Sequence, residues 1–228
     1  MTKLTRLLLF GLLTALFVVL PTACEENLYD EENAVDWAAL NARAFEAKLK
    51  EARTAVAAAK AEYGADWEAH CDWRVFRTYA QSEEVPGKST DSICVQILER
   101  GTGSGSPLYT DSVRVNYLGR LVSTDATEPI GTPGEVFDHS GLTQDYESIF
   151  SPQFSRPTMF RVSNLVEGFT TALMRMRIGD LWRVYIPNEL GYGGNSTTSL
   201  PAYSMLIFDM QLKAYYRAGT QPGPGPWK

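Results

Sequence analysis

The chain has 228 residues and a formal net charge of −6, from 21 Lys and Arg against 27 Asp and Glu. This length suits one or two domains, and a hydrophobic content of 44% is ordinary for a globular protein. The acidic balance disfavours nucleic-acid binding, which depends on basic side chains that neutralise phosphates. The two histidines, His70 and His139, are far apart, so no metal or other cofactor is expected.

Residues 1–23 have the anatomy of a targeting segment. Lys3 and Arg6 precede an apolar run from Leu7 to Leu20. That run is shorter than the roughly 20 residues that a membrane-spanning helix needs. Small residues then lead to Cys24, so the pattern predicts a bacterial lipoprotein signal peptide, cleaved before Cys24, with lipid on its thiol. An ordinary secretory signal with a chance cysteine is the alternative.

The acidic segment 24–33 is predicted to be a tether. Glu25 and Glu26, directly after the cysteine, resemble the tags that send some lipoproteins of Gram-negative bacteria to the cell surface; a merely solvated tether is the alternative. The sequence therefore predicts a cell-envelope protein, an outer-membrane lipoprotein bound to the membrane through Cys24. Whether it is periplasmic or surface-exposed stays open.

Residues 34–64 predict a long helix, because Ala, Glu, Lys and Arg dominate between an N-cap at Asn33 and a terminating Gly64. Apolar residues recur there at alternating spacings of four and three. The large members of this stripe are Phe45, Leu49, Val56 and Tyr63. Two interpretations remain: a homodimer through residues 34–63, or a helix that lies on its own domain or acts as a spacer. Half of the stripe is alanine, so it buries little area, which favours the second interpretation.

Two strands are expected next. Residues 73–79 nearly alternate between apolar and polar side chains, and residues 91–99 form a second apolar run, with a turn between them and a glycine-rich loop at 101–107. Cys71 and Cys94 are either a disulfide, as an oxidising compartment allows, or two reduced buried thiols.

The stretch 165–193 is the most informative part of the chain. Phe169 to about Ile178 has helical spacing, and Gly179 is suited to end that helix. Residues 181–186 then alternate as a strand until Pro187, which cannot donate to a sheet. A glycine-rich loop carrying Tyr192 follows.

Five ordered motifs cover about half of the chain. They are VRVNYLG at 113–119, VFDHS at 136–140, PTMF at 157–160, LVEGF at 165–169 and LPAYSMLIFDMQL at 200–212. In this order they resemble the FKBP family of peptidyl-prolyl cis-trans isomerases, in its bacterial lipoprotein form.

The resemblance implies an α+β fold: an FKBP-like twisted antiparallel sheet of five or six strands, wrapped on one short helix and preceded by the long N-terminal helix. The domain would span 65–217, with its core at 107–216, and the tail 218–228 is expected to be disordered. Two insertions, 122–134 and 141–156, are expected to form surface loops. Three aromatics of the second insertion would either touch a client or anchor the loop: Tyr146, Phe150 and Phe154.

The resemblance also implies the site. Asp138 and Tyr192 would be the catalytic polar groups, beside the reacting carbonyl and donating to a substrate carbonyl respectively. Phe137 would close one wall. The remaining substrate-binding residues would be Tyr117, Phe160, Leu165, Val166, Phe169, Leu200 and Phe208. Core packing is the plain alternative for each aromatic.

The predicted function is a peptidyl-prolyl cis-trans isomerase that assists the folding of exported, proline-containing polypeptides. The twisted X-Pro amide would be favoured by a dry aromatic pocket, without a nucleophile. Phe169 stands where the family usually has Trp, and the second insertion removes a basic residue that can brace Asp138. A catalytically weak or inactive FKBP-like peptide-binding module or chaperone at the cell envelope is therefore the alternative.

Overall fold

The computed structural model describes residues 31–82, 84–142 and 144–219, with side chains from residue 36 onward. The predicted signal peptide, Cys24 and most of the predicted tether lie outside the described residues, as does the tail from residue 220. Within the described part, no helix combines the length and the apolar character that crossing a membrane requires.

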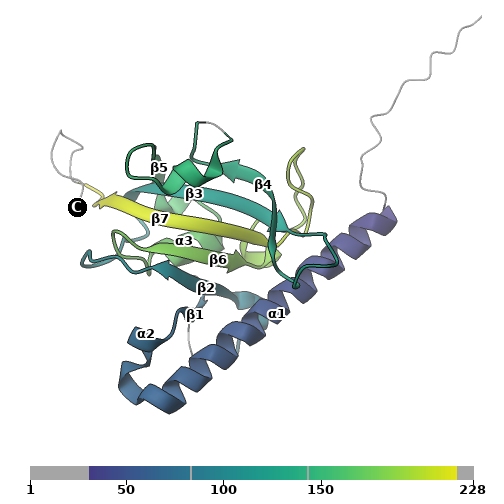
Figure 1. Ribbon diagram of the computed structural model, residues 1–228, viewed down its shortest axis with the longest axis horizontal. Coiled ribbons are helices and arrows are strands. Elements are labelled where there is room, and N and C mark those ends of the chain that lie inside the picture. The colour runs from purple at the N-terminus through teal and green to yellow at the C-terminus, as the bar shows by residue number, and fades with distance from the viewer. Residues whose placement is uncertain (1–30, 83, 143, 220–228) are drawn as a thin grey trace, which may run out of the picture.

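The centre of the molecule is one antiparallel sheet of seven strands (Figure 1). Its order is β1-β2-β6-β7-β3-β4, and β5 pairs with the other part of β3. The strands are β1 (Trp73–Arg77), β2 (Ser92–Glu99), β3 (Ser112–Val122), β4 (Pro133–His139), β5 (Thr158–Arg161), β6 (Leu181–Ile186) and β7 (Leu206–Tyr216). The α+β class is confirmed. The strand number exceeds the predicted five or six, because both lead-in strands and the short β5 join the same sheet.

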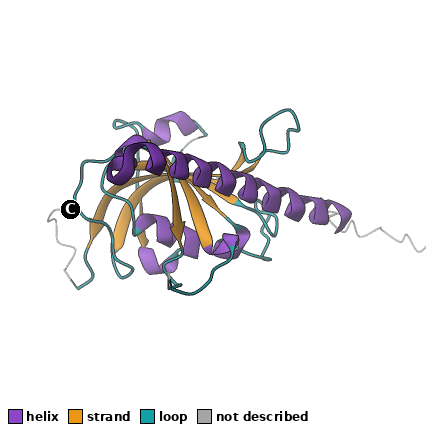
Figure 2. Ribbon diagram, turned by 90° about the horizontal axis from the view of Figure 1, so that it is seen from below, coloured by secondary structure: helices purple, strands orange, loops and turns teal. Residues whose placement is uncertain are grey.

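The sheet separates two helices. Alternation along β2 and β6 sends Val95 and Val184 into one core and Cys94 and Tyr185 into another. The short helix α3 (Glu167–Leu173) packs on the first face and the long helix α1 (Glu31–Tyr63) crosses the second (Figure 2). A third, single-turn helix, α2 (Trp67–His70), follows α1.

Helix α3 is shorter than predicted. Its apolar face is buried as expected, with Phe169 and Met176 both at most 4% exposed, but the α-helix ends at Leu173 and not near Ile178. Beyond Leu173 the chain tightens, and the Arg175 N–H donates to the Ala172 carbonyl three residues back. The apolar residues thus keep helical spacing beyond Leu173, although the turn that follows is not α-helical. This spacing made the predicted helix too long.

Helix α1 lies on its own domain. It begins at Glu31, three residues before the predicted start, so Asn33 is inside the helix and not its N-cap. Four buried apolar residues of its inner face pack in one cluster with Met205, Tyr185 and Ile207: Ala44, Phe45, Leu49 and Ala52. The intramolecular interpretation is confirmed for this part of the stripe. Farther along, Tyr63 is 39% exposed and stacks on His70.

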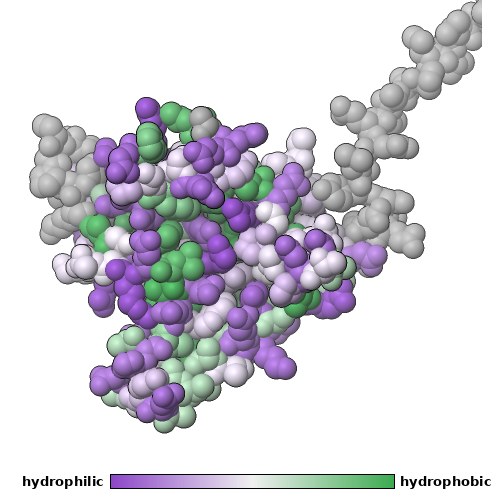
Figure 3. Space-filling view, in the orientation of Figure 1, coloured by the Kyte–Doolittle hydropathy of each residue, from purple (hydrophilic) through white to green (hydrophobic). Residues whose placement is uncertain are grey.

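The outer side of α1 leaves the dimer interpretation open. A shallow hollow of about 560 Å³ lies there, lined mainly by small residues of α1 and by Trp73. On the face drawn in Figure 3, the surface over the C-terminal end of α1 mixes weakly hydrophobic and hydrophilic residues and forms no continuous apolar stripe.

The two cysteines of the domain are free and buried. Cys94 lies in the middle of β2, paired with Val75 and Tyr185, where burial raises the pKa of its thiol to about 12. Cys71 follows α2, and its thiol contacts the Trp73 carbonyl oxygen at 3.5 Å. Of the two states left open by the sequence, the structure shows the reduced one.

Both insertions are surface loops, as predicted. The first folds back on α1: a Cβ built on Gly131 would lie 2.9 Å from Cε of Lys48. The second holds a 3-10 turn, Tyr146–Phe150, and is anchored by the buried Ile149. Of its aromatics, Tyr146 packs edge-on against His139, whereas Phe154 is 73% exposed and anchors nothing.

Leu49→Ala tests whether α1 is part of the domain. Leu49 is 1% exposed, so its truncation should lower the free energy of unfolding by about 2–5 kcal/mol within a single urea transition. The matched control is Leu142→Ala at 73% exposure, which should change it by less than about 0.5 kcal/mol. An unchanged midpoint in Leu49→Ala would show that α1 is only a spacer.

Candidate active site

The site forms where three strands run side by side. In β3, Gly119 pairs with Phe208 of β7 on one side and with Asp138 of β4 on the other. A Cβ at this position would lie 2.6 Å from Cε1 of Phe208 and 2.8 Å from Cζ of Phe137. A glycine is needed here because the two aromatic rings lie directly over the backbone of the central strand.

Aromatic rings from five segments meet above this glycine. Phe169 of α3 packs edge-on against Phe208, with ring centroids 5.0 Å apart, and Phe208 packs edge-on against Phe137 at 5.4 Å. Tyr117 of β3 lies 5.6 Å from Phe160 of β5 and within 6.2 Å of both Phe169 and Phe208. Edge-to-face pairs of this kind add to the stability that burial alone provides. We call these five residues the aromatic cluster.

Helix α3 supplies the floor of the cluster. A Cβ on Gly168 would lie 2.3 Å from Cγ2 of Ile186, so the glycine lets α3 approach β6 closely. This approach places Phe169 of α3 beneath Phe208. Only 4% of the surface of Phe169 is exposed. Phe169 thus lies at the bottom of the aromatic cluster.

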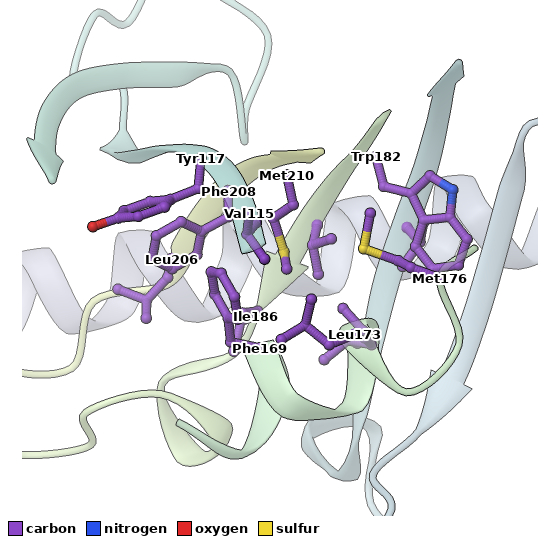
Figure 4. Packing of buried hydrophobic residues seen from close by; sticks show 14 of the residues in the cluster. Val115, Tyr117, Phe169, Leu173, Met176, Trp182, Ile186, Leu206, Phe208 and Met210 are labelled. Carbon is purple, nitrogen blue, oxygen red and sulfur yellow. The ribbon is translucent and has the colours of Figure 1, made fainter. Parts of the chain in front are cut away.

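One edge of the cluster is polar. The Tyr117 hydroxyl lies 3.2 Å from each carboxylate oxygen of Asp138 and donates to that group. In Figure 4 the Tyr117 hydroxyl points outward from the packed rings of Phe208 and Phe169. Burial, followed by the negative charge of Asp138, raises the pKa of the Tyr117 phenol well above its usual range, so Tyr117 remains a donor.

The pair is fixed by the end of β4. The Tyr117 N–H donates to Oγ of Ser140 at 3.0 Å, and the Ser140 N–H donates back to the Tyr117 carbonyl oxygen at 3.0 Å. Sequence reasoning did not single out Ser140 or Gly119, although both lie inside the quoted motifs. A glycine within a strand is itself a signal of close approach, and this signal points to Gly119.

Tyr192 lies on the rim of the site. Its side chain is 44% exposed, and burial, then the nearby charge of Asp138, raise the pKa of its phenol. The structure thus brings Tyr117, Asp138 and Tyr192 into one electrostatic neighbourhood. A protonated, half-exposed hydroxyl beside an apolar cluster is suited to donate to a carbonyl of a bound peptide.

The other predicted residues fall at different depths. Leu165 and Val166 are partly buried against the core beside Phe160, immediately before α3. Leu200 is only 4% exposed and belongs to the core, and its backbone N–H and carbonyl both pair with Thr197 in the loop. Leu200 therefore supports the loop from beneath, and its backbone is engaged within the chain.

The chemistry open to this arrangement is limited. It offers apolar ring faces, two phenol donors and one carboxylate, and no nucleophile aligned with a base accompanies them. A reaction that needs dehydration and orientation of an amide, without a covalent intermediate, suits such a site.

Comparisons with known proteins agree with this geometry. Residues 103–213 match the family described as FKBP-type peptidyl-prolyl cis-trans isomerase. The macrophage infectivity potentiator of Trypanosoma cruzi is 32% identical over 140 residues, 61% of this chain and 61% of that protein. FkpA of Escherichia coli, an FKBP-type peptidyl-prolyl cis-trans isomerase, is 30% identical over 171 residues, 75% of this chain and 53% of that protein.

A third relative is the outer membrane protein MIP of Legionella longbeachae, 30% identical over 124 residues, 54% of this chain and 44% of that protein. The alignments thus span about half the length of these curated relatives. The site and the match together indicate that residues 103–213 form a domain similar to FKBP-type prolyl isomerases.

Gly119→Ala tests the close packing at the centre of the site. The added methyl group should push Phe137 and Phe208 apart and cost about 1–3 kcal/mol of unfolding free energy, with a changed near-ultraviolet circular dichroism spectrum. The control is Gly194→Ala, where a Cβ would approach only the Tyr203 side chain, with the hydroxyl nearest at 3.2 Å. Equal, small effects of both substitutions would contradict the proposed packing.

Proposed function

We propose that this protein is a peptidyl-prolyl cis-trans isomerase that assists the folding of exported proteins. The observation that carries the proposal is the aromatic cluster with the Tyr117–Asp138 pair at its edge, in which the Tyr117 hydroxyl lies 3.2 Å from each carboxylate oxygen. The match of residues 103–213 to the FKBP-type family supports the same activity. The substrates are proline-containing polypeptides.

The reaction needs little more than this site offers. Rotation about an X-Pro bond is opposed by a barrier of about 20 kcal/mol, because the planar amide has partial double-bond character. In the twisted amide the nitrogen is no longer conjugated and the group is less polar. A dry site that grips the prolyl ring and removes water from the planar amide therefore favours the twisted state.

Each part of the site has a role in this scheme. Phe169 forms the base on which the prolyl ring lies, and Tyr117, Phe160 and Phe208 surround it. Phe137 closes one wall against Phe208. Leu165 and Val166 lie beside the base, where the backbone of Leu165 bonds a peptide flanking the proline.

The polar groups act at the rim. Asp138, oriented by the Tyr117 hydroxyl, presents its negative field to the reacting carbonyl. Tyr192 donates its hydroxyl to a substrate carbonyl and so fixes the peptide. The substitution of Phe169 for the usual Trp removes an N–H at the base, yet desolvation by the ring does not depend on that N–H.

A second candidate function is peptide binding with weak turnover or none. Leu142 and Phe154, both on the second insertion, are each 73% exposed. Exposed apolar side chains on a loop are suited to hold unfolded segments of a client. Under this alternative the domain is an FKBP-like binding module or chaperone at the cell envelope, and the insertion performs the recognition.

A protease-coupled assay on an X-Pro peptide distinguishes the two functions. The chain lacking residues 1–24 should accelerate isomerisation, and Asp138→Ala and Tyr192→Phe should each lower kcat/KM by about tenfold, the loss of roughly 1.4 kcal/mol of transition-state stabilisation. Leu142→Ala, on the second insertion, is the control: it should leave kcat/KM unchanged if the protein is an isomerase, because only the binding alternative uses Leu142. An isomerisation rate equal to the uncatalysed rate at high enzyme concentration would refute the isomerase and favour the binding module.

We place the protein in the cell envelope, bound to the outer membrane through lipid on Cys24. The name of one relative, the outer membrane protein MIP of Legionella longbeachae, supports an envelope location. The lipid anchor rests on the anatomy of residues 1–24. A homodimer through residues 34–63 would use the outer side of α1, because the inner side is buried on the sheet.

Radiolabelled palmitate tests the anchor. Cells that produce the whole chain should incorporate the label, and Cys24→Ser should abolish incorporation because the lipid-bearing thiol is lost. Cys71→Ser, which changes a cysteine inside the domain, is the matched control and should retain the label. Equal labelling of the wild type and Cys24→Ser would contradict the proposed anchor.

A further inference from the structure

The loop from Gly191 to Met205 joins the rim of the site to the last strand. It carries Tyr192 near its start and Leu200 in the core, and it ends where β7 begins. Helix α1 contacts this end of the loop: in Figure 1, β7 starts beside the first half of α1. The contact joins two parts of the chain that are more than 160 residues apart.

Two hydrogen bonds make the contact. The indole N–H of Trp37 donates to Oγ of Ser204 at 3.0 Å, and the Met205 N–H donates to Oδ1 of Asn41 at 2.8 Å. The amide of Asn41 is also fixed at its other end, because Nδ2 donates to the Trp37 carbonyl oxygen at 2.8 Å. Both groups of the side chain are therefore used, and its orientation is defined.

The bond between Asn41 and Met205 is buried, and the bond between Trp37 and Ser204 is partly buried. Asn41, Ser204 and Met205 are 1%, 4% and 1% exposed. A polar side chain this deeply buried on a helix is costly unless its partners are present. Asn41 therefore fixes the position of α1 relative to the end of the loop. An apolar residue at this position would let α1 shift along the loop.

The hydrogen bond from Met205 to Asn41 lies next to a strained part of the loop backbone, which needs fixed surroundings. Tyr203 has a φ of +60°, the one positive value among non-glycine residues of the described chain. A bulky residue in this region persists only when its surroundings fix it. Here the Tyr203 N–H donates to the Gly193 carbonyl oxygen at 2.7 Å, and Oγ of Ser204 donates to the Pro201 carbonyl oxygen at 2.6 Å.

The strained turn leads directly to the site. Gly193, which accepts the bond from Tyr203, is the residue after Tyr192. Asn41 is thus linked to the backbone beside the rim hydroxyl by two hydrogen bonds, its own bond to Met205 and the bond from Tyr203 to Gly193, which the backbone of residues 203–205 connects. If the end of the loop were released, the bond to Gly193 and the position of Tyr192 would lose their support.

We infer that Asn41 and Trp37 of α1 are positioning residues of the isomerase site, which act through the loop 191–205 on Tyr192. The inference rests on the proposed function for its effect on turnover. Helix α1 then belongs to the enzyme, and is more than a spacer between the membrane and the domain. Neither residue touches the substrate.

The test compares two substitutions on the same buried face of α1. Asn41→Ala removes the acceptor for the Met205 N–H. Ala52→Gly is the control: Ala52 is fully buried on the sheet, and glycine destabilises a helix by about 1 kcal/mol relative to alanine. The control lies eleven residues along α1, about 16 Å from Asn41 at 1.5 Å per residue. Trp37→Phe, which keeps a ring and removes the N–H, is a second, milder variant.

The Tm of each variant is determined first, and two further measurements are then made below its unfolding transition. The first is kcat/KM on an X-Pro peptide, and the second is hydrogen exchange of the amides in 191–205. Asn41→Ala should lower kcat/KM by roughly tenfold and speed exchange in this loop, because misplacing a group at an active site is costly even when the change is remote. Trp37→Phe should act in the same direction with a smaller effect. Ala52→Gly should change kcat/KM by less than about twofold.

The outcomes separate this inference from the proposed function. Unchanged loop exchange in Asn41→Ala would overturn the inference, as would an equal loss of kcat/KM in Ala52→Gly at an equal loss of Tm. If the wild type shows no turnover, the proposed function fails, and faster exchange confined to Asn41→Ala and Trp37→Phe would still support the tie between α1 and the loop.

Discussion

The close approach of three strands at Gly119 is the constraint on which the site depends. Because β3 lies between β4 and β7, one glycine is paired with Asp138 and Phe208 at the same level. The missing side chain leaves room for two rings over the backbone. The same register places Tyr117, two residues earlier and therefore on the same face, beside both the rings and the carboxylate. The apolar and polar halves of the site thus have one geometric origin.

The two faces of the sheet have different roles. The face covered by α3 carries the aromatic cluster, whose close packing is set by Gly168 against Ile186. The face covered by α1 contains no part of the site, yet it fixes the loop that reaches around to the rim through Asn41 and Ser204. Because helices pack on both faces, most residues of the central strands β6 and β7 are buried.

Much of the fold follows from local sequence patterns. The parts that could not be predicted in this way are those that depend on partners far away in the chain. Alternation located β1 and β6, the ordered motifs located β3 and β7, and the same motifs placed Tyr117, Phe169 and Phe208 in one cluster. The end of α3 was overestimated because Met176 keeps helical spacing in a turn of another kind. A stripe of Phe45 and Leu49 cannot show from sequence whether it faces the same chain or a second copy. Asn41 gave no signal at all, because its partner is 164 residues away.

The distance along the chain between α1 and its partners has a consequence for how the protein is made. Trp37 and Asn41 are near the start of the chain, and the residues they bond, Ser204 and Met205, come just before its last strand. Contacts of such long sequence separation form late and slowly. During synthesis, α1 can pack on β1, β2 and β6 before β7 is made, but Met205 and Ile207 are not yet available to it. A chain truncated before Ser204 would therefore leave part of the apolar side of α1 uncovered and would lack both hydrogen bonds that fix the end of the loop.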